Sequence, residues 1–91
     1  MVLLDLLGRR WALRILWELR EGEAFTFRQL RVRCEDVSPT VLNTRLAELR
    51  DARIVEHGST GYSLSEQGSA LLHSLAPLHT WAETWAATPP E

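Results

Sequence analysis

The stretch SPTVLNTRLAELRDARIV, residues 38 to 55, restricts the possible folds more than any other part of the chain. Ser38 is a preferred residue before a helix, and Pro39 suits the first helical position because its missing N–H is not needed there. The apolar residues that follow at helical spacing are Leu42, Leu46 and Leu49. A β-branched pair comes directly after Arg53 and begins an extended segment. The stretch therefore predicts a helix over residues 39–52, with one buried face, that leads into a β-hairpin.

The other face of this helix is expected to carry short side chains. The residues that point away from the leucines on a 3.6-residue wheel are Thr40, Asn43, Thr44 and Ala47. Short side chains let the backbone approach the major groove of DNA, where Asn43 can pair with adenine and the threonines can meet base edges or thymine methyl groups. Ser38 and the free N–H groups at the helix start suit a phosphate. A solvated surface face is the alternative, but Thr and Asn are poor helix formers and would lower stability without structural benefit.

Helical periodicity also predicts the segments before this helix. VLLDLLG, near the start of the chain, is a short apolar helix that Gly8 ends or bends. Residues 9–23 are amphipathic, with an apolar stripe that begins at Trp11. Thr26 is a good N-cap for the next helix, whose inward stripe ends at Cys34.

The segments after residue 52 predict a hairpin and a long helix. RIVEH and GYSL have the composition of two short strands, joined by a tight polar turn. Ser65 is a further N-cap, and Pro77 is expected to kink the long helix after it or to divide it in two. This order of elements predicts a mostly α fold with a small β-hairpin, the winged helix-turn-helix. We expect a single domain over residues 1–91, with the helix-turn-helix and wing at about 24–64 and flanking helices at 1–20 and 66–87.

The charge of the chain is unevenly distributed. The net charge is −2, but all ten basic residues are arginines at or before Arg53, in a part that also holds eight acidic residues. From Ile54 onward there are four acidic residues and no lysine or arginine. The first part is therefore about +2 and the second about −4, so the first can approach phosphates while the second faces elsewhere.

The sequence gives little support for a disulfide-bonded, membrane, secreted or metal-binding protein, or for an enzyme. The single cysteine allows no internal disulfide, and its place on an inward stripe predicts a packing role. No apolar run approaches the ~18 residues of a membrane helix, and the N-terminal residues lack the order of a secretion signal, so a cytoplasmic protein is expected. His79 and Glu83 lie one helical turn apart but are too few ligands for a metal site. No catalytic nucleophile and base can be assembled by spacing, so the sequence predicts no enzyme, metal or cofactor, and it identifies no small-molecule effector.

Four segments of the chain, in this order, are similar to a known family. They are LLGRRWALRILWEL, FTFRQL, SPTVLNTRLAELRDARIV and YSLSEQGSALL, between about residues 4 and 85. The most specific parts are the Gly-basic-Trp element at Gly8, Arg10 and Trp11 and the YSLSEQG element at residues 62–68. Together they resemble the HxlR-type winged helix-turn-helix transcriptional regulators of bacteria. The resemblance implies a dimer in which residues 39–52 read the major groove, residues 54–64 form the wing, and the terminal helices make the dimer.

Two places depart from the family pattern. The wing is shorter than is usual, and its tip, GSTG at residues 58–61, has no arginine or lysine. Ser59 and Thr60 are therefore expected to give only weak phosphate contacts. Arg53 stands where the family has a glycine after the recognition helix, and a left-handed conformation there would cost about 1 kcal/mol.

The sequence and the resemblance together select two sets of site residues. The DNA-binding set is Arg28, Ser38, Pro39, Thr40, Asn43, Thr44, Arg50, Ser59 and Thr60, in which the two arginines are expected to contact phosphates. The dimer-interface set is Leu3, Leu4, Leu7, Leu78, Trp81 and Trp85, because tryptophan is enriched at interfaces. Packing within one chain is the alternative explanation for the tryptophans.

These observations predict a sequence-specific DNA-binding regulator that acts as a homodimer on an inverted repeat in double-stranded DNA, with no membrane association. The alternative is a winged-helix module that binds protein without specific DNA recognition. The pI of about 5.9 and the arginine-free wing favour the alternative. The outward polar face of residues 39–52 and the arginines beside it favour the regulator.

Overall fold

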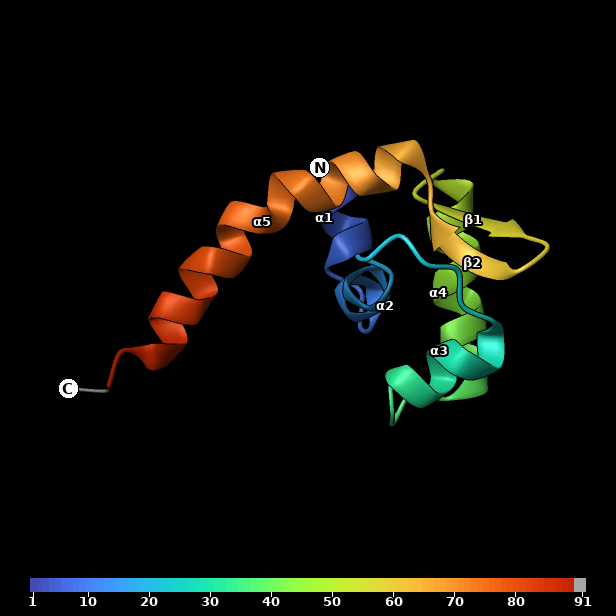
Figure 1. The fold of residues 1–91 in the computed structure, drawn as a ribbon, viewed down its shortest axis with the longest axis horizontal. Helices are drawn as coiled ribbons and strands as arrows, with labels where there is room; N and C mark the ends of the chain where they lie inside the picture. The colour runs from blue at the N-terminus through green and yellow to red at the C-terminus, as the bar shows by residue number, and fades with distance from the viewer. Residues whose placement is uncertain (90–91) are drawn as a thin grey trace.

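The structure, a computed structural model, describes residues 1–89. Over these residues the chain forms five helices and one two-stranded antiparallel sheet, in the order that the sequence predicts (Figure 1). The helices are α1 (Val2–Leu7), α2 (Ala12–Glu18), α3 (Phe27–Arg33), α4 (Pro39–Asp51) and α5 (Glu66–Ala87), and the strands are β1 (Val55–Gly58) and β2 (Gly61–Leu64). The predicted mostly α fold with a small hairpin is confirmed.

Side-chain caps start three of the helices at the predicted residues. Thr26 accepts a hydrogen bond from the backbone N–H of Gln29, and the Gln29 side chain accepts one from the N–H of Thr26, which completes a capping box at α3. Ser38 accepts from the N–H of Val41 at 3.1 Å and caps α4. Ser65 caps α5 in the same way. Each bond satisfies an N–H group that has no partner within the first helical turn.

The wing is tied to the chain segment that leads into α3. The two strands of the wing are joined by a turn at Ser59 and Thr60. The N–H of Phe25 donates to the carbonyl of Tyr62 at 2.9 Å, and the N–H of Tyr62 donates to the carbonyl of Phe25 at 2.7 Å. Gly61 lies at this crossing with φ +127, and a Cβ there would stand 2.4 Å from the carbonyl oxygen of Phe25. A glycine is therefore required where the wing meets this segment.

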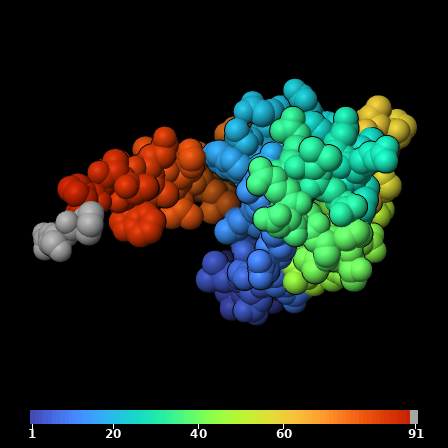
Figure 2. Space-filling model, turned by 90° about the horizontal axis from the view of Figure 1, so that it is seen from below, coloured from blue at the N-terminus to red at the C-terminus, as the bar shows by residue number. Residues whose placement is uncertain are grey.

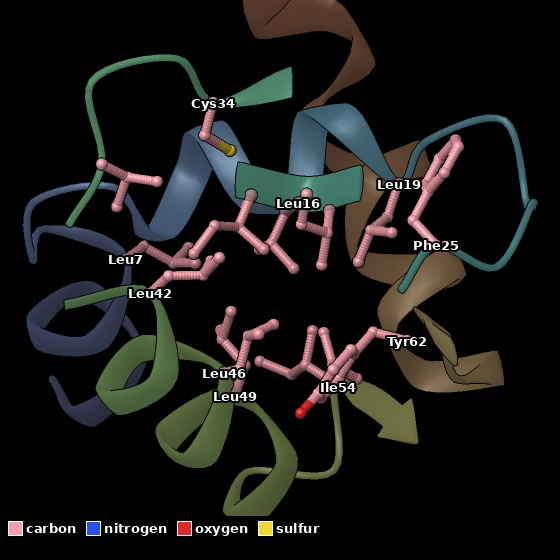
Figure 3. Close-up of a cluster of buried hydrophobic side chains, with 14 residues drawn as sticks. Leu7, Leu16, Leu19, Phe25, Cys34, Leu42, Leu46, Leu49, Ile54 and Tyr62 are labelled. Carbon is pink, nitrogen blue, oxygen red and sulfur yellow. The ribbon is translucent and has the colours of Figure 1, made fainter. Parts of the chain in front are cut away.

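One cluster of buried apolar side chains joins the helices to the wing (Figure 3). Helix α4 contributes its three predicted leucines, each at most 1% exposed, namely Leu42, Leu46 and Leu49. They face side chains such as Leu16 of α2 across the core. Leu7 of α1 belongs to the same cluster, so this residue, expected at a dimer interface, packs in the core of its own chain.

Helix α2 is shorter than the sequence predicts. Gly8 ends α1, as predicted, but Trp11 precedes α2 instead of belonging to it. Trp11 adopts φ +77, a left-handed conformation that a right-handed helix cannot contain. The turn between Gly8 and Ala12 therefore places α1 and α2 as two separate short helices.

Helix α5 is continuous, with Pro77 inside it. Proline has no N–H to donate to the carbonyl one turn earlier, and its ring crowds that carbonyl. Figure 1 shows a change of direction near the middle of α5, so a kink is observed and the helix is not divided. The part of α5 from residue 77 to 87, which we call the arm, extends away from the rest of the molecule on the side opposite the wing (Figures 1 and 2).

Candidate nucleic-acid interface

The exposed face of α4 carries the short side chains predicted for contact with bases. Thr40, Asn43, Thr44 and Ala47 are all exposed. The hydroxyl of Thr44 donates to the carbonyl of Thr40 at 2.9 Å, so Thr44 offers a base edge an oxygen acceptor and a methyl group. Within residues 1–89 the Asn43 amide forms no side-chain hydrogen bond, which leaves its N–H₂ and its carbonyl for a base.

The same face becomes acidic at its C-terminal end. Asp51 is exposed and lies on the side of α4 that also carries Thr40, Thr44 and Ala47, at helical spacing. A carboxylate in this place repels phosphates. The first three turns of α4 are therefore the part of the helix that suits DNA.

The predicted contacts outside this face lie on two further elements. Ser38 and Pro39 are exposed at the N-terminus of α4, where the helix dipole favours a phosphate. Ser59 and Thr60 are exposed at the tip of the wing, on a separate element. Figure 1 places α4 and the wing on the same side of the molecule, away from the arm.

The arginines divide into two groups according to their partners. Five form ion pairs with carboxylates of the chain: Arg9 and Arg45 with Glu48, Arg14 and Arg33 with Glu18, and Arg20 with Glu21. Among the residues that the structure describes, the arginines with no carboxylate within 4.0 Å are Arg10, Arg28, Arg31, Arg50 and Arg53. We call this second group the free arginines. Their charges are available to a partner molecule.

Four of the free arginines belong to the helix-turn-helix unit and the turn after it. Arg28 and Arg31 come from α3, and Arg50 and Arg53 come from the C-terminal end of α4 and the turn after it. Arg28 and Arg50 were predicted as phosphate contacts, whereas Arg31 and Arg53 were not. Arg31 follows Arg28 by three residues, and this spacing places both on one face of α3. The three-residue spacing of these two arginines can be read from the sequence, so Arg31 could have been predicted together with Arg28.

The single cysteine, Cys34, has a structural role. Cys34 is fully buried, and burial raises the pKa of its thiol, with a smaller opposing effect from Arg14. The thiol therefore packs as an apolar group, as predicted. Over residues 1–89, no three His, Cys, Asp or Glu side chains converge on a point that would hold a metal ion. Within the same range, every helix is too short or too polar to cross a bilayer.

The residues predicted for a dimer interface separate into exposed and packed ones. Leu4 is 64% exposed, and Leu78, Trp81 and Trp85 on the arm are 57%, 60% and 65% exposed. The rings of Trp81 and Trp85 stack at 5.9 Å between centroids, with planes 10° apart. Leu3 is half-buried against the core. Over residues 1–89, the arm therefore presents three large apolar side chains that keep more than half of their surface exposed.

Comparison with known proteins relates this fold to regulators of transcription. The HxlR-like helix-turn-helix family model matches residues 6–89. The HTH-type transcriptional regulator YvaP of Bacillus subtilis (strain 168) is 30% identical over 88 residues, which are 89% of this chain and 81% of YvaP.

Two solved structures share the fold. The quinone-bound YodB from B. subtilis superposes with a TM-score of 0.83 at 31% identity, over 91% of this chain and 93% of YodB. A possible HxlR family transcriptional factor from Thermoplasma volcanium GSS1 superposes with a TM-score of 0.82 at 29% identity, over 93% of this chain and 82% of that protein. These matches confirm the predicted winged helix-turn-helix, and the chain belongs to the HxlR-like helix-turn-helix family of transcriptional regulators.

Proposed function

We propose that this protein is a sequence-specific DNA-binding regulator of transcription that acts in the cytoplasm as a homodimer, with α4 of each copy in the major groove. The observation that carries the proposal is the exposed face of α4 with its short polar side chains, together with the four free arginines on α3, at the end of α4 and in the turn after it. The short side chains admit the helix to the groove, and the arginines neutralise phosphates on either side of it.

The proposed dimer rests on the apolar pattern of α5. Residues at alternating spacings of four and three form one seam along the helix: Leu71, Leu75, Leu78, Ala82 and Trp85. Such spacing is typical of two helices that pack along their length. Its first two leucines are half-buried against the body of the chain, and the seam then continues onto the exposed arm. In a two-fold arrangement centred on Leu78, Trp85 of one copy lies against Leu71 of the other.

This dimer geometry is compatible with DNA binding. The arm and the wing point to opposite sides of the molecule (Figures 1 and 2), so pairing through the arms leaves the exposed face of α4 uncovered in both copies. Two recognition helices related by a two-fold axis read two inverted half-sites about one helical turn apart. An inverted repeat in double-stranded DNA is therefore the proposed target.

Selection of fragments from a genomic DNA pool at two salt concentrations tests the function. A specific regulator enriches an inverted repeat, and its affinity falls steeply between about 50 and 200 mM salt because bound phosphates release counterions. Recovery of no common sequence at either salt concentration would contradict specific recognition.

Binding to a protein in place of DNA is the second candidate function. The wing has no arginine or lysine, and the pI is about 5.9, both unusual for a DNA-binding module. A pool that yields no enriched sequence, together with a stable monomer in solution, would favour this candidate.

A further inference from the structure

The wing carries one side chain that can become a cation, His57. The residues from Val55 to Leu64 include no arginine or lysine. A winged helix ordinarily uses its wing to hold the DNA backbone beside the recognition helix, and such contacts favour a positive charge. His57 is exposed near the tip of β1, and its imidazole is the only basic side chain of the wing.

The imidazole of His57 is held in a defined place. His57 lies directly opposite Tyr62 in the register of the hairpin. Their rings stack in parallel, with centroids 4.0 Å apart and planes at 0°. Tyr62 is 8% exposed and belongs to the core cluster, and its backbone is bonded to Phe25. Because its stacking partner is fixed, the imidazole does not need to be ordered when a ligand arrives.

His57 lines a hollow between the end of α4 and the wing. The hollow has a volume of about 690 Å³. The charged residues around it, besides His57, are Arg50 and Asp51 of α4, Arg53 of the following turn, Glu56 of β1 and Glu66 of α5. Two arginines against three carboxylates give a net charge of −1 when His57 is neutral, and protonation of His57 brings the hollow to zero. The electrostatic character of this surface therefore depends on one imidazole.

The hollow lies between α4 and the wing, and its carboxylates, at Asp51, Glu56 and Glu66, oppose a phosphate there unless a further positive charge is present. When α4 lies in the major groove and the wing lies beside the duplex, the phosphates that border the major groove pass between these two elements. We infer that His57 is the phosphate contact of the wing and makes this contact as an imidazolium, so that each protomer takes up one proton when it binds DNA. This inference rests on the proposed function.

Proton uptake sets the sign of the pH dependence. A complex that contains one more bound proton per protomer than the free components becomes more stable as the pH falls. The affinity for DNA is therefore expected to rise as the pH is lowered through the range in which an imidazole titrates, and to level off below it. The logarithm of the association constant changes by at most one per pH unit for each protomer.

Anisotropy titrations of the full chain with its selected operator, from pH 8.0 to 5.5, test the inference. The wild type should bind at least about fivefold more tightly at pH 5.5, since a hydrogen bond to a charged group contributes about that factor or more. H57Q should show no such increase between pH 8.0 and pH 5.5. H57R should bind at pH 8.0 as tightly as the wild type at pH 5.5, with a salt dependence steeper by about one unit per protomer.

H73Q is the matched control, because His73 is an exposed histidine on α5, away from the hollow, and its loss should leave the pH dependence unchanged. Thermal unfolding of each variant checks that the fold is intact. Equal pH dependence in H57Q and the wild type, or no gain in H57R at pH 8.0, would overturn the role of His57 while leaving the regulator proposal in place. A wild type that selects no sequence at any pH would overturn both.

Discussion

Gly68 of α5 lies in direct contact with the backbone of Ile54, at the start of the wing. A Cβ on Gly68 would stand 2.1 Å from the carbonyl oxygen of Ile54 and 3.3 Å from its Cγ2. The same carbonyl accepts a hydrogen bond from the N–H of Ser65 at 2.9 Å and another from its hydroxyl at 3.1 Å. The first turn of α5 is therefore docked on the backbone that connects α4 to β1.

We expect Gly68→Ala to destabilise the protein, because the added methyl group must push α5 away from Ile54. Overpacking of this kind costs about 1–3 kcal/mol. The free energy of unfolding in urea measures the loss. Gly58→Ala is the control, since a Cβ at Gly58 meets no atom within 4 Å. Equal stability of the two variants would show that α5 can move without cost.

Arg53→Gly should stabilise the fold. Arg53 has φ +62, and the N–H of Arg53 donates to Arg50 while that of Ile54 donates to Leu49, the pair of bonds that closes a helix in a Schellman motif. A side chain in this left-handed conformation costs about 1 kcal/mol relative to glycine. Thermal melts should show the gain in Arg53→Gly. Arg53→Ala removes the same charge without relieving the strain, so its melting temperature should stay near that of the wild type.

Asn43→Ala should relax the choice of base at one position of each half-site by about 1–3 kcal/mol, because a bidentate contact to a base is lost. Competition titrations with operators altered one base pair at a time report this change. The fold should be unaffected, since Asn43 is exposed. If the ranking of the altered operators does not change, Asn43 does not read a base.

Arg28→Gln and Arg50→Gln should each weaken binding to all sequences alike and lower the slope of log affinity against log salt by about one per protomer. Both arginines lack a carboxylate partner within residues 1–89, so their charge is free for a phosphate. Arg20→Gln is the matched control, because Arg20 lies near Glu21 and stacks on Trp17. A loss confined to particular sequences would mean that Arg28 or Arg50 contacts a base.

Trp81→Ala and Trp85→Ala should give folded proteins that dissociate more readily. Both side chains lie on the exposed arm, and truncation of an anchoring tryptophan costs about 2 kcal/mol or more at an interface, felt twice in a two-fold dimer. Sedimentation equilibrium measures the dissociation constant. Val32→Ala, an exposed apolar residue of α3 that is 73% exposed, should leave it unchanged. A wild type that sediments as a monomer at micromolar concentration would remove the basis of this prediction.

The helix-turn-helix unit was predictable because its signals are local in sequence. Ser38 and Thr26 start their helices through bonds to residues three positions ahead, and the leucines of α4 repeat with the period of the helix. Each of these features is decided within a few residues of the chain. The predicted ends of α4 and of the strands are accordingly close to the observed ones.

Contacts between distant residues set the limit of the sequence prediction. Arg9 pairs with Glu48, which is 39 residues away in the sequence. Arg10 has no carboxylate partner within the described chain, and no local sequence pattern distinguishes Arg9 from Arg10. Leu7 is expected at an interface because the family resemblance places the N-terminal helix in the dimer and the predicted winged core does not require the apolar segment around Leu7. The left-handed conformation of Trp11 turns that segment back onto the core, and this depends on tertiary packing.

The backbone contacts at the two ends of the wing make the separation between the wing and α4 a fixed dimension of the molecule. Phe25 holds β2 from one side, and Gly68 closes on Ile54 at the start of β1. If α4 and the wing bind DNA together as proposed, a duplex whose groove spacing differs from this dimension would twist or bend to fit, at a cost set by the stiffness of its dinucleotide steps. The protein is then expected to prefer certain base pairs that none of its side chains contacts, because the energy needed to deform the DNA depends on its sequence.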